Sequence, residues 1–206
     1  MMDLFKLLIS TYAKANNESG NYFRELILIT AEMNQAVANC KSILDHRGLL
    51  VTPGASRKFI FPIGDKAGLA MITVNINMYV KSAQTFYNKM GLFVMTSEQL
   101  RIYDEEERIH RYPSPQAVAK KASPEGRGIF DAFASAQEYV LDRRHHVEHR
   151  ENEEVLNRMK SVIEIATIDD QDALIHTFVQ DYHKIAISLT EIHETLFKLK
   201  RGYLDT

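Results

Sequence analysis

The sequence predicts an all-α protein built as a bundle of about six or seven helices. Over several long stretches, apolar residues recur every three or four positions, the spacing that places them on one face of a helix. Turn-forming and helix-capping residues separate these stretches. The chain has 206 residues, 45% of them hydrophobic, which is enough for one sizeable core and short for two. We therefore expect a single domain over residues 1–206.

The first part of the chain predicts a short helix, a long helix and a loop. Residues 2–15 carry apolar side chains at helical spacing, and the turn formers of residues 16–21 end that helix. Residues 22–46 form an apolar stripe that contains neither glycine nor proline, so we expect a long core helix. Gly48 is its expected C-terminal cap, and the prolines within residues 49–64 favour an ordered loop.

The middle of the chain predicts a second long helix, a shorter segment and a basic connection. Asp65 can cap a helix whose apolar stripe continues to Gly91, its expected end. Thr96-Ser97-Glu98-Gln99 has the spacing of a capping box, in which a hydroxyl and a carboxylate or amide side chain cap one helix start reciprocally. We therefore expect a shorter segment from there to about Arg108. Prolines and lysines are frequent over residues 109–128, which favours a mobile loop.

The last part of the chain predicts two or three further helices. Ser123-Pro124-Glu125 places a capping residue, a proline and an acid in the order typical of a helix start, and this helix should carry residues 129–150. No breaker follows until about Ile168, so the pattern fits one very long helix or two with a bend near residue 150. Asp169-Asp170 then caps a last long helix over residues 171–201.

Composition excludes several classes of protein. The formal net charge is −2, so no overall field attracts nucleic acid or an anionic membrane, and an RNA contact would need a local basic patch. Cys40 is the only cysteine, which excludes an intrachain disulfide and indicates a buried structural thiol. The sequence shows no signal peptide and no run of about 18 apolar residues, so we expect a soluble, cytoplasmic protein without membrane contact.

The strongest candidate for chemistry is the charged stretch, Asp142-Arg143-Arg144-His145-His146-Val147-Glu148-His149-Arg150. Eight of its nine residues can carry charge, although the residues on both sides follow apolar helical spacing. On a continuous helix Arg144 shares a face with Phe133 and Val140, so its guanidinium should be buried or interfacial, with Glu148 as a possible partner. Arg144 and His149 would lie about 140° apart around such a helix.

The order of arginine, polar residue, three further residues and histidine in Arg144-His145-His146-Val147-Glu148-His149 resembles the catalytic motif of the HEPN superfamily. That family consists of helical bundles and includes many metal-independent ribonucleases of toxin–antitoxin, phage-defence and RNA-processing systems. The resemblance implies that Arg144 holds the scissile phosphate, that His149 is the general base on the ribose 2′-hydroxyl, and that His145 is the polar helper. It implies no metal or other cofactor.

The same resemblance implies partners. HEPN proteins are typically dimers that bring two copies of the motif together, so we expect a homodimer with the site at its interface, and an antitoxin or another protein as a possible further partner. RNA is the expected substrate. The basic residues that could line an RNA path are Lys120, Lys121, Arg127 and Arg143.

Three other interpretations of the charged stretch remain open. His145 and His149 are four residues apart, and with His46 they could form a three-histidine metal site, as in DinB-like helical bundles. The protein could instead be a non-catalytic HEPN-like module that binds a nucleotide or a protein partner through the same region. The stretch could also be a salt-bridged helix surface with idle histidines. Elsewhere we expect no catalytic or ligand-binding role for His176, His183, His193 or the acidic run 104–107.

Overall fold

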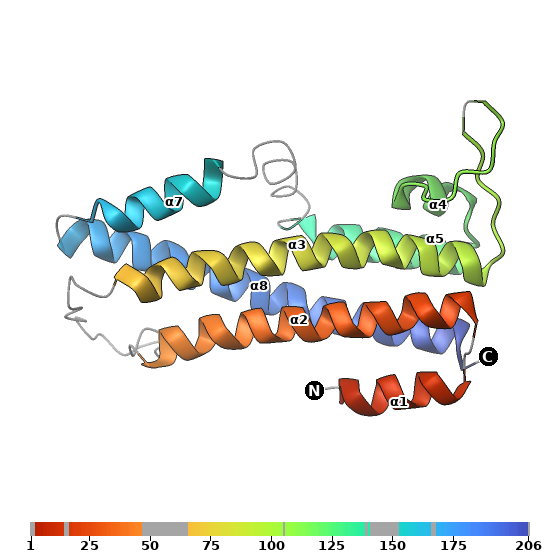
Figure 1. Cartoon of the computed structure of the whole chain (residues 1–206), viewed down its shortest axis with the longest axis horizontal. Helices are drawn as coiled ribbons and strands as arrows, with labels where there is room; N and C mark the ends of the chain where they lie inside the picture. The colour runs from red at the N-terminus through yellow and green to blue at the C-terminus, as the bar shows by residue number, and fades with distance from the viewer. Residues whose placement is uncertain are drawn as a thin grey trace.

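The computed structural model describes residues 3–14, 17–46, 66–104, 106–138, 140, 153–165 and 168–205 (Figure 1). Within these residues it has seven helices, which confirms the predicted all-α bundle. They are α1 (Leu4–Lys14), α2 (Glu18–His46), α3 (Lys66–Ser97), α4 (Pro115–Lys121), α5 (Pro124–Ala136), α7 (Glu153–Ile163) and α8 (Ile168–Tyr203).

Helices α2 and α3 form an antiparallel pair. Near one end of the pair, the Asn39 amide donates to the Asn75 side chain at 2.9 Å. Near the other end, the Lys89 ammonium lies 2.5 Å from the Glu25 carboxylate. From the first contact to the second, the residue number decreases along α2 and increases along α3. The two helices therefore run in opposite directions.

Helix α8 runs along α3 in the same direction. The Tyr79 hydroxyl lies 2.6 Å from the Ser188 hydroxyl, and the Tyr203 hydroxyl donates to Glu98 at 2.6 Å. From the first contact to the second, the residue number increases along both helices. Helix α8 is therefore parallel to α3 and antiparallel to α2. These three helices, of 29, 32 and 36 residues, run the length of the bundle (Figure 1).

Two shorter helices, α5 and α7, lie one after the other along α8. The first turn of α5 lies beside Tyr203, and Gln137, just after α5, donates to the Ser188 carbonyl at 3.0 Å. Farther along, Arg158 of α7 pairs with Asp181 at 2.5 Å. α5 therefore runs antiparallel to α8 over its C-terminal half. Figure 1 shows α7, which packs mainly against α3, also running opposite to α8, nearer the N-terminus of α8. Residues 137–152, which include the charged stretch, connect them.

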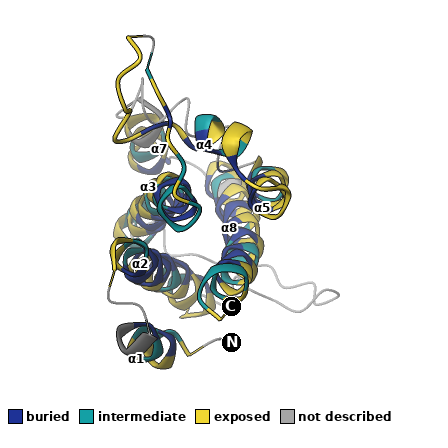
Figure 2. Ribbon diagram, turned by 90° about the vertical axis from the view of Figure 1, so that its right-hand side faces the viewer, coloured by how far each residue is buried: buried dark blue, intermediate teal, exposed yellow. Residues whose placement is uncertain are grey.

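The core fills the space between these helices. Figure 2 shows the buried residues facing the middle of the bundle, with exposed residues on the outside. Phe133 of α5 stacks on Tyr87 and Phe86 of α3, with ring centroids 5.1 and 5.8 Å away. On the α2 side Phe23 packs against Phe93 at 5.3 Å. These aromatic contacts join α2, α3 and α5 into one core.

Two predicted ends of the long helices were wrong. α2 begins at Glu18 and not at Tyr22, because the Asn17 side chain accepts the backbone N–H of Gly20 at 2.8 Å and caps the helix earlier. α3 continues through Gly91 to Ser97. A β-carbon at Gly91 would lie 3.3 Å from the Pro115 backbone, so this glycine permits close approach of α4 and does not end the helix.

The predicted capping box at residues 96–99 was also wrong. Thr96 lies in the last turn of α3, where its hydroxyl donates to the Leu92 carbonyl at 2.9 Å. Gln99 follows with a φ of 53°, which ends the helix. The segment predicted as a loop over 109–128 contains α4, capped by the Ser114 hydroxyl, which accepts from Ala117 N–H at 3.2 Å.

The Ser123 helix start is confirmed, but this helix does not run to residue 150. The Ser123 hydroxyl accepts from Gly126 N–H at 3.1 Å, and α5 ends at Ala136, followed by Gln137 with φ −106° and ψ 16°. The last helix begins at Ile168, slightly before the predicted cap. The predictions for Gly48, residues 49–64 and Asp65 lie outside the described residues.

In the described part of the chain, no helix combines the length and the apolar character that crossing a membrane requires.

Candidate functional site

The predicted catalytic residues lie in the connection between α5 and α7. Arg143, Arg144, His145 and His149 all fall outside the described residues, so the structure does not place their side chains. His46 is the exposed last residue of α2, but its two partners in the alternative three-histidine site are among those undescribed residues. Within the described ranges, no three histidine, cysteine, aspartate or glutamate side chains gather in a way that could hold a metal ion.

A buried polar cluster holds the chain where it leaves α5 for the charged stretch. Gln137 is 1% exposed, and its Nε2 donates to the Ser188 carbonyl at 3.0 Å and to the Glu191 carboxylate at 3.3 Å. The Ser188 hydroxyl donates to Gln137 Oε1. Because that hydroxyl has one hydrogen, Tyr79 must donate to it. Both ends of the Gln137 amide are thus satisfied inside the bundle, which fixes this point of the chain.

An acid on α8 beside this cluster, Glu191, has a shifted pKa. Burial raises the pKa of the Glu191 carboxyl, and the nearby negative charge of Glu194 raises it further. Burial also raises the pKa of the Tyr79 phenol. Both shifts favour the neutral, hydrogen-bonding forms of these groups beside Gln137.

The non-helical backbone at Gln137 changes the predicted surroundings of Arg144. The sequence placed Arg144 on one helical face with Phe133 and Val140, both of which are buried. That assignment required a continuous helix, whereas α5 ends at Ala136. The helical register before Gln137 therefore does not determine the direction of Arg144.

The predicted RNA-path residues lie at the other end of α5. Lys120 and Lys121 are in the last turn of α4, and Arg127 is in the first turns of α5; all three are exposed. Among the described residues none of them forms an ion pair. Arg127 lies about 14 Å before the end of α5, from the helical rise of about 1.5 Å per residue. These cations therefore lie around the start of α5, at the opposite end of that helix from Gln137, where the chain leaves for the charged stretch.

Glu98 organises the end of the bundle where these cations lie, which the sequence did not predict. Its carboxylate accepts the Ser123 backbone N–H at 2.8 Å, the Ser123 hydroxyl at 2.7 Å and the Tyr203 hydroxyl at 2.6 Å. Burial alone would raise the pKa of this carboxyl, but the hydrogen bonds from Tyr203 and Ser123 outweigh it and hold the pKa below its ordinary value. One side chain thus joins the ends of α3 and α8 to the start of α5.

We expect Glu98→Gln to lower stability at neutral pH by about 1–2 kcal/mol, because a neutral amide accepts these hydrogen bonds less strongly and the site is partly exposed. The folded-state pKa of Glu98 is depressed, so its contribution is present above the unfolded-state value and is lost as pH falls through the folded-state value. Urea unfolding at pH 7 and at pH 3 measures the difference in the free energy of unfolding between the parent and Glu98→Gln. The difference between parent and variant should shrink at pH 3; an unchanged difference would contradict the assignment.

Two glycines of α5 provide a matched pair of substitutions. A β-carbon at Gly126 would lie 2.7 Å from the Glu98 carboxylate and 2.8 Å from the Tyr203 hydroxyl, whereas nothing lies within 4 Å of one at Gly128. We expect Gly126→Ala to destabilise the fold by about 1–3 kcal/mol. Gly128→Ala should stabilise it by about 0.5–1 kcal/mol, because alanine favours the helix. Thermal denaturation compares the two, and equal effects would contradict the described contact.

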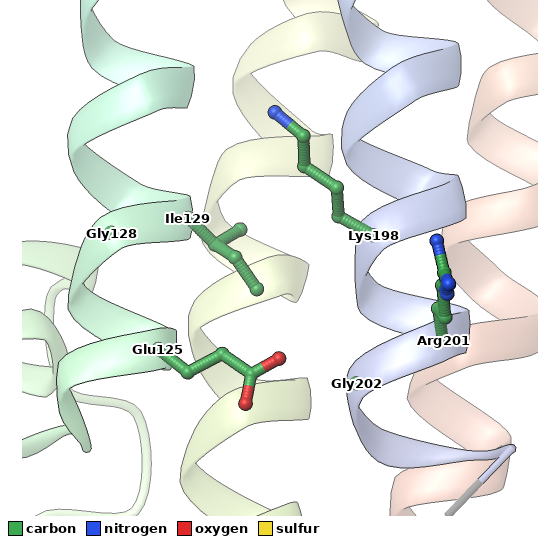
Figure 3. A pocket seen from close by; sticks show the side chains of 6 residues that line it. All are labelled: Glu125, Gly128, Ile129, Lys198, Arg201 and Gly202. Carbon is green, nitrogen blue, oxygen red and sulfur yellow. The ribbon is translucent and has the colours of Figure 1, made fainter.

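A pocket of about 440 Å³ opens between the start of α5 and the end of α8 (Figure 3). Its walls are formed from α5 by Glu125, Gly128 and Ile129, and from α8 by Lys198, Arg201 and Gly202. In Figure 3 the Glu125 side chain extends from α5 toward α8, while Lys198 and Arg201 project from α8. The sequence did not predict this pocket, because its two walls are about 70 residues apart in the chain.

Three residues for which no chemistry was predicted have structural roles. His193 is half-buried and its Nε2 lies 3.1 Å from Asn34 Oδ1, so it connects α8 to α2; burial lowers the pKa of its imidazole. Asp104 is not simply solvated, because its carboxylate accepts the Arg108 backbone N–H at 2.8 Å and holds a turn. Cys40 is fully buried and burial raises its pKa to about 12, which confirms the predicted structural thiol.

Comparison with known proteins gives no relative: no protein-family model, no curated protein and no solved structure matches the chain.

Proposed function

We propose that this protein is a metal-independent endoribonuclease of HEPN type. The supporting observation is the buried anchor at Gln137, five residues before the charged stretch begins. α2, α3 and α8 are long helices, whereas α5 packs mainly against α8 and α7 mainly against α3, and the stretch belongs to the chain that joins α5 to α7. The buried Gln137 cluster anchors the start of that connection. An arginine- and histidine-rich segment is thereby attached to a rigid support, as a catalytic segment requires.

The proposed reaction needs only the residue types that the stretch supplies. Arg144 binds the oxygens of the scissile phosphate, since its guanidinium is always charged and matches their geometry. His149 removes the proton from the ribose 2′-hydroxyl, aided by His145. The 2′-oxygen then attacks phosphorus, the bond to the 5′-oxygen breaks, and that oxygen takes up a proton. The products are a 2′,3′-cyclic phosphate end and a 5′-hydroxyl end.

The proposed RNA path runs from the charged stretch along α5. Arg143 contributes next to the site, and Lys120, Lys121 and Arg127 contribute at the far end of the helix. Since the net charge of the chain is −2, such a local group of exposed cations must supply the attraction for phosphate.

We further propose that the active form is a homodimer. On any one helix Arg144 and His149 would lie about 140° apart, which makes it difficult for one copy to direct both at the same phosphate. A second copy of the stretch across a two-fold interface supplies the missing group. An antitoxin or other protein partner would then act by covering the same interface. Sedimentation analysis of the purified chain tests the dimer, and a strictly monomeric active protein would contradict it.

The experiment that tests the proposed activity is RNA cleavage by the purified full-length chain in excess EDTA. We expect cleavage, with 2′,3′-cyclic phosphate ends identified by their resistance to phosphatase until acid opens the ring to a monophosphate, which phosphatase then removes. Cleavage that appears only when metal ions are restored would favour the three-histidine site of His46, His145 and His149. Failure to cleave single-stranded, structured and transfer RNAs would contradict the proposal and favour the non-catalytic binding module.

A further inference from the structure

The pocket between α5 and α8 carries charged groups that the proposed cleavage does not use. Its volume of about 440 Å³ lies within the range typical of small-molecule sites. It is formed by the first turns of α5 and the last turns of α8, whereas the charged stretch begins beyond the other end of α5. The residues that line the pocket include none of the proposed catalytic residues.

The α8 wall of the pocket presents two cations. Lys198 and Arg201 are three residues apart, so they lie on the same face of α8, and both are exposed. Within the described part of the chain neither forms an ion pair. In Figure 3 the two side chains project in different directions from α8, but both are long and exposed, so both can turn toward one bound phosphate. A guanidinium that can bind two oxygens and an ammonium together suit a phosphate group carrying up to two negative charges.

The α5 wall differs in chemistry. The Glu125 carboxylate is an acceptor of hydrogen bonds and repels an anion, so it favours the hydroxyl end of a ligand over its phosphate. Ile129 contributes an apolar surface. Gly128 leaves the wall without a side chain, and nothing lies within 4 Å of the position where its β-carbon would be. A ligand can therefore approach the α5 backbone closely at this point.

We propose that this pocket binds a sugar phosphate, with the phosphate held by Lys198 and Arg201 and the sugar hydroxyls donating to Glu125. The opposite polarity of the two walls carries the proposal, because it selects a ligand that is anionic at one end and a hydrogen-bond donor at the other. A sugar phosphate occurs as a free metabolite and as the repeating unit of RNA. The first source gives a small-molecule site, and the second gives an anchoring site for RNA away from the cleavage centre.

Calorimetric titration of the full-length chain tests the proposal with three probes: ribose 5-phosphate, inorganic phosphate and ribose. We expect ribose 5-phosphate to bind, inorganic phosphate to bind more weakly and ribose not to bind measurably. Arg201→Ala and Lys198→Ala should each weaken ribose 5-phosphate binding about tenfold or more, the loss expected for one charge-assisted hydrogen bond. Arg111→Ala removes the same charge from an exposed residue outside the pocket and should leave the affinity unchanged.

A steric variant separates occupation of the pocket from general charge attraction. Gly128→Leu places a side chain at the open α5 wall, where no atom obstructs its β-carbon, and should abolish binding while the circular dichroism spectrum stays that of the parent. If this variant does not fold, the charge reversal Arg201→Glu replaces it, with abolished binding again expected. Binding that survives either folded variant, or that Arg111→Ala weakens equally, would overturn the proposal. So would the absence of ribose 5-phosphate binding at millimolar concentration.

A fourth titration distinguishes the two sources, with a short oligoribonucleotide and the His149→Ala protein, in which cleavage should be lost. Tighter binding than that of ribose 5-phosphate, lost in Gly128→Leu, supports RNA as the ligand. Oligoribonucleotide binding that Gly128→Leu leaves unchanged, beside lost ribose 5-phosphate binding, supports a free sugar phosphate. The proposal does not depend on the ribonuclease activity, because binding is measured at equilibrium and the pocket variants keep Arg144 and His149. Cleavage without ribose 5-phosphate binding means that the pocket proposal has failed. Ribose 5-phosphate binding without cleavage means that the ribonuclease proposal has failed.

Discussion

Phe133→Ala is expected to destabilise the fold by about 3–5 kcal/mol, the range for removing a fully buried aromatic ring from a core. Phe133 is 1% exposed, and its ring stacks on both Tyr87 and Phe86. Alanine leaves a cavity between α5 and α3 that the long helix α3 cannot collapse to fill. Urea unfolding at 25 °C followed by circular dichroism measures the loss as a lower midpoint with an unchanged slope.

Phe197→Ala is the matched control, because it removes the same side chain from α8, where Phe197 is 52% exposed. We expect a loss of less than about 1 kcal/mol. Phe133→Leu, which retains most of the volume, should lie between the two variants. Similar losses for Phe133→Ala and Phe197→Ala would contradict the placement of α5 against α3.

The apolar periodicity predicted the long helices well because burial of one helix face is a local property of the sequence. Helix ends depend on contacts that are not local. Gly91 looked like a helix end, yet it lies within α3 because Pro115 packs against it. Glu98 looked like part of a helix start, yet it accepts hydrogen bonds from Ser123 and Tyr203, residues of other elements. Spacing alone could not distinguish these roles.

In the candidate site, too, local features could be predicted from the sequence and features that depend on distant contacts could not. Composition drew attention to the charged stretch, since so many ionisable residues rarely interrupt an apolar pattern. Gln137 gave no such signal: its importance follows from Ser188 and Glu191, which lie more than 50 residues later. The pocket lined by Lys198 and Arg201 likewise exists only because α8 returns alongside α5. Residues that act through distant partners become recognisable only when the helices are placed.

The second large effect is expected in catalysis: His149→Ala and Arg144→Ala should each lower the rate of RNA cleavage by about 10²–10⁴-fold. His149→Ala removes the general base on the 2′-hydroxyl, whose contribution is typically of this size. Arg144→Ala removes the charge that stabilises the developing phosphorane, a comparable electrostatic term. Initial rates with a fluorescently labelled RNA in excess EDTA measure both, beside unfolding curves that show the variants to be as stable as the parent.

Two controls make this result specific to the charged stretch. His176→Ala changes an exposed histidine of α8, and Arg111→Ala changes an exposed arginine before α4; both should keep the parent rate within about twofold. If Arg144 positions phosphate through its planar fork, Arg144→Lys should restore little of the rate, because an ammonium cannot bind two oxygens in the same way. Equal loss in a control and in a motif variant would instead indicate that charge, and not a catalytic arrangement, governs the activity. Full activity of His149→Ala would remove the proposed general base and with it the HEPN-type mechanism.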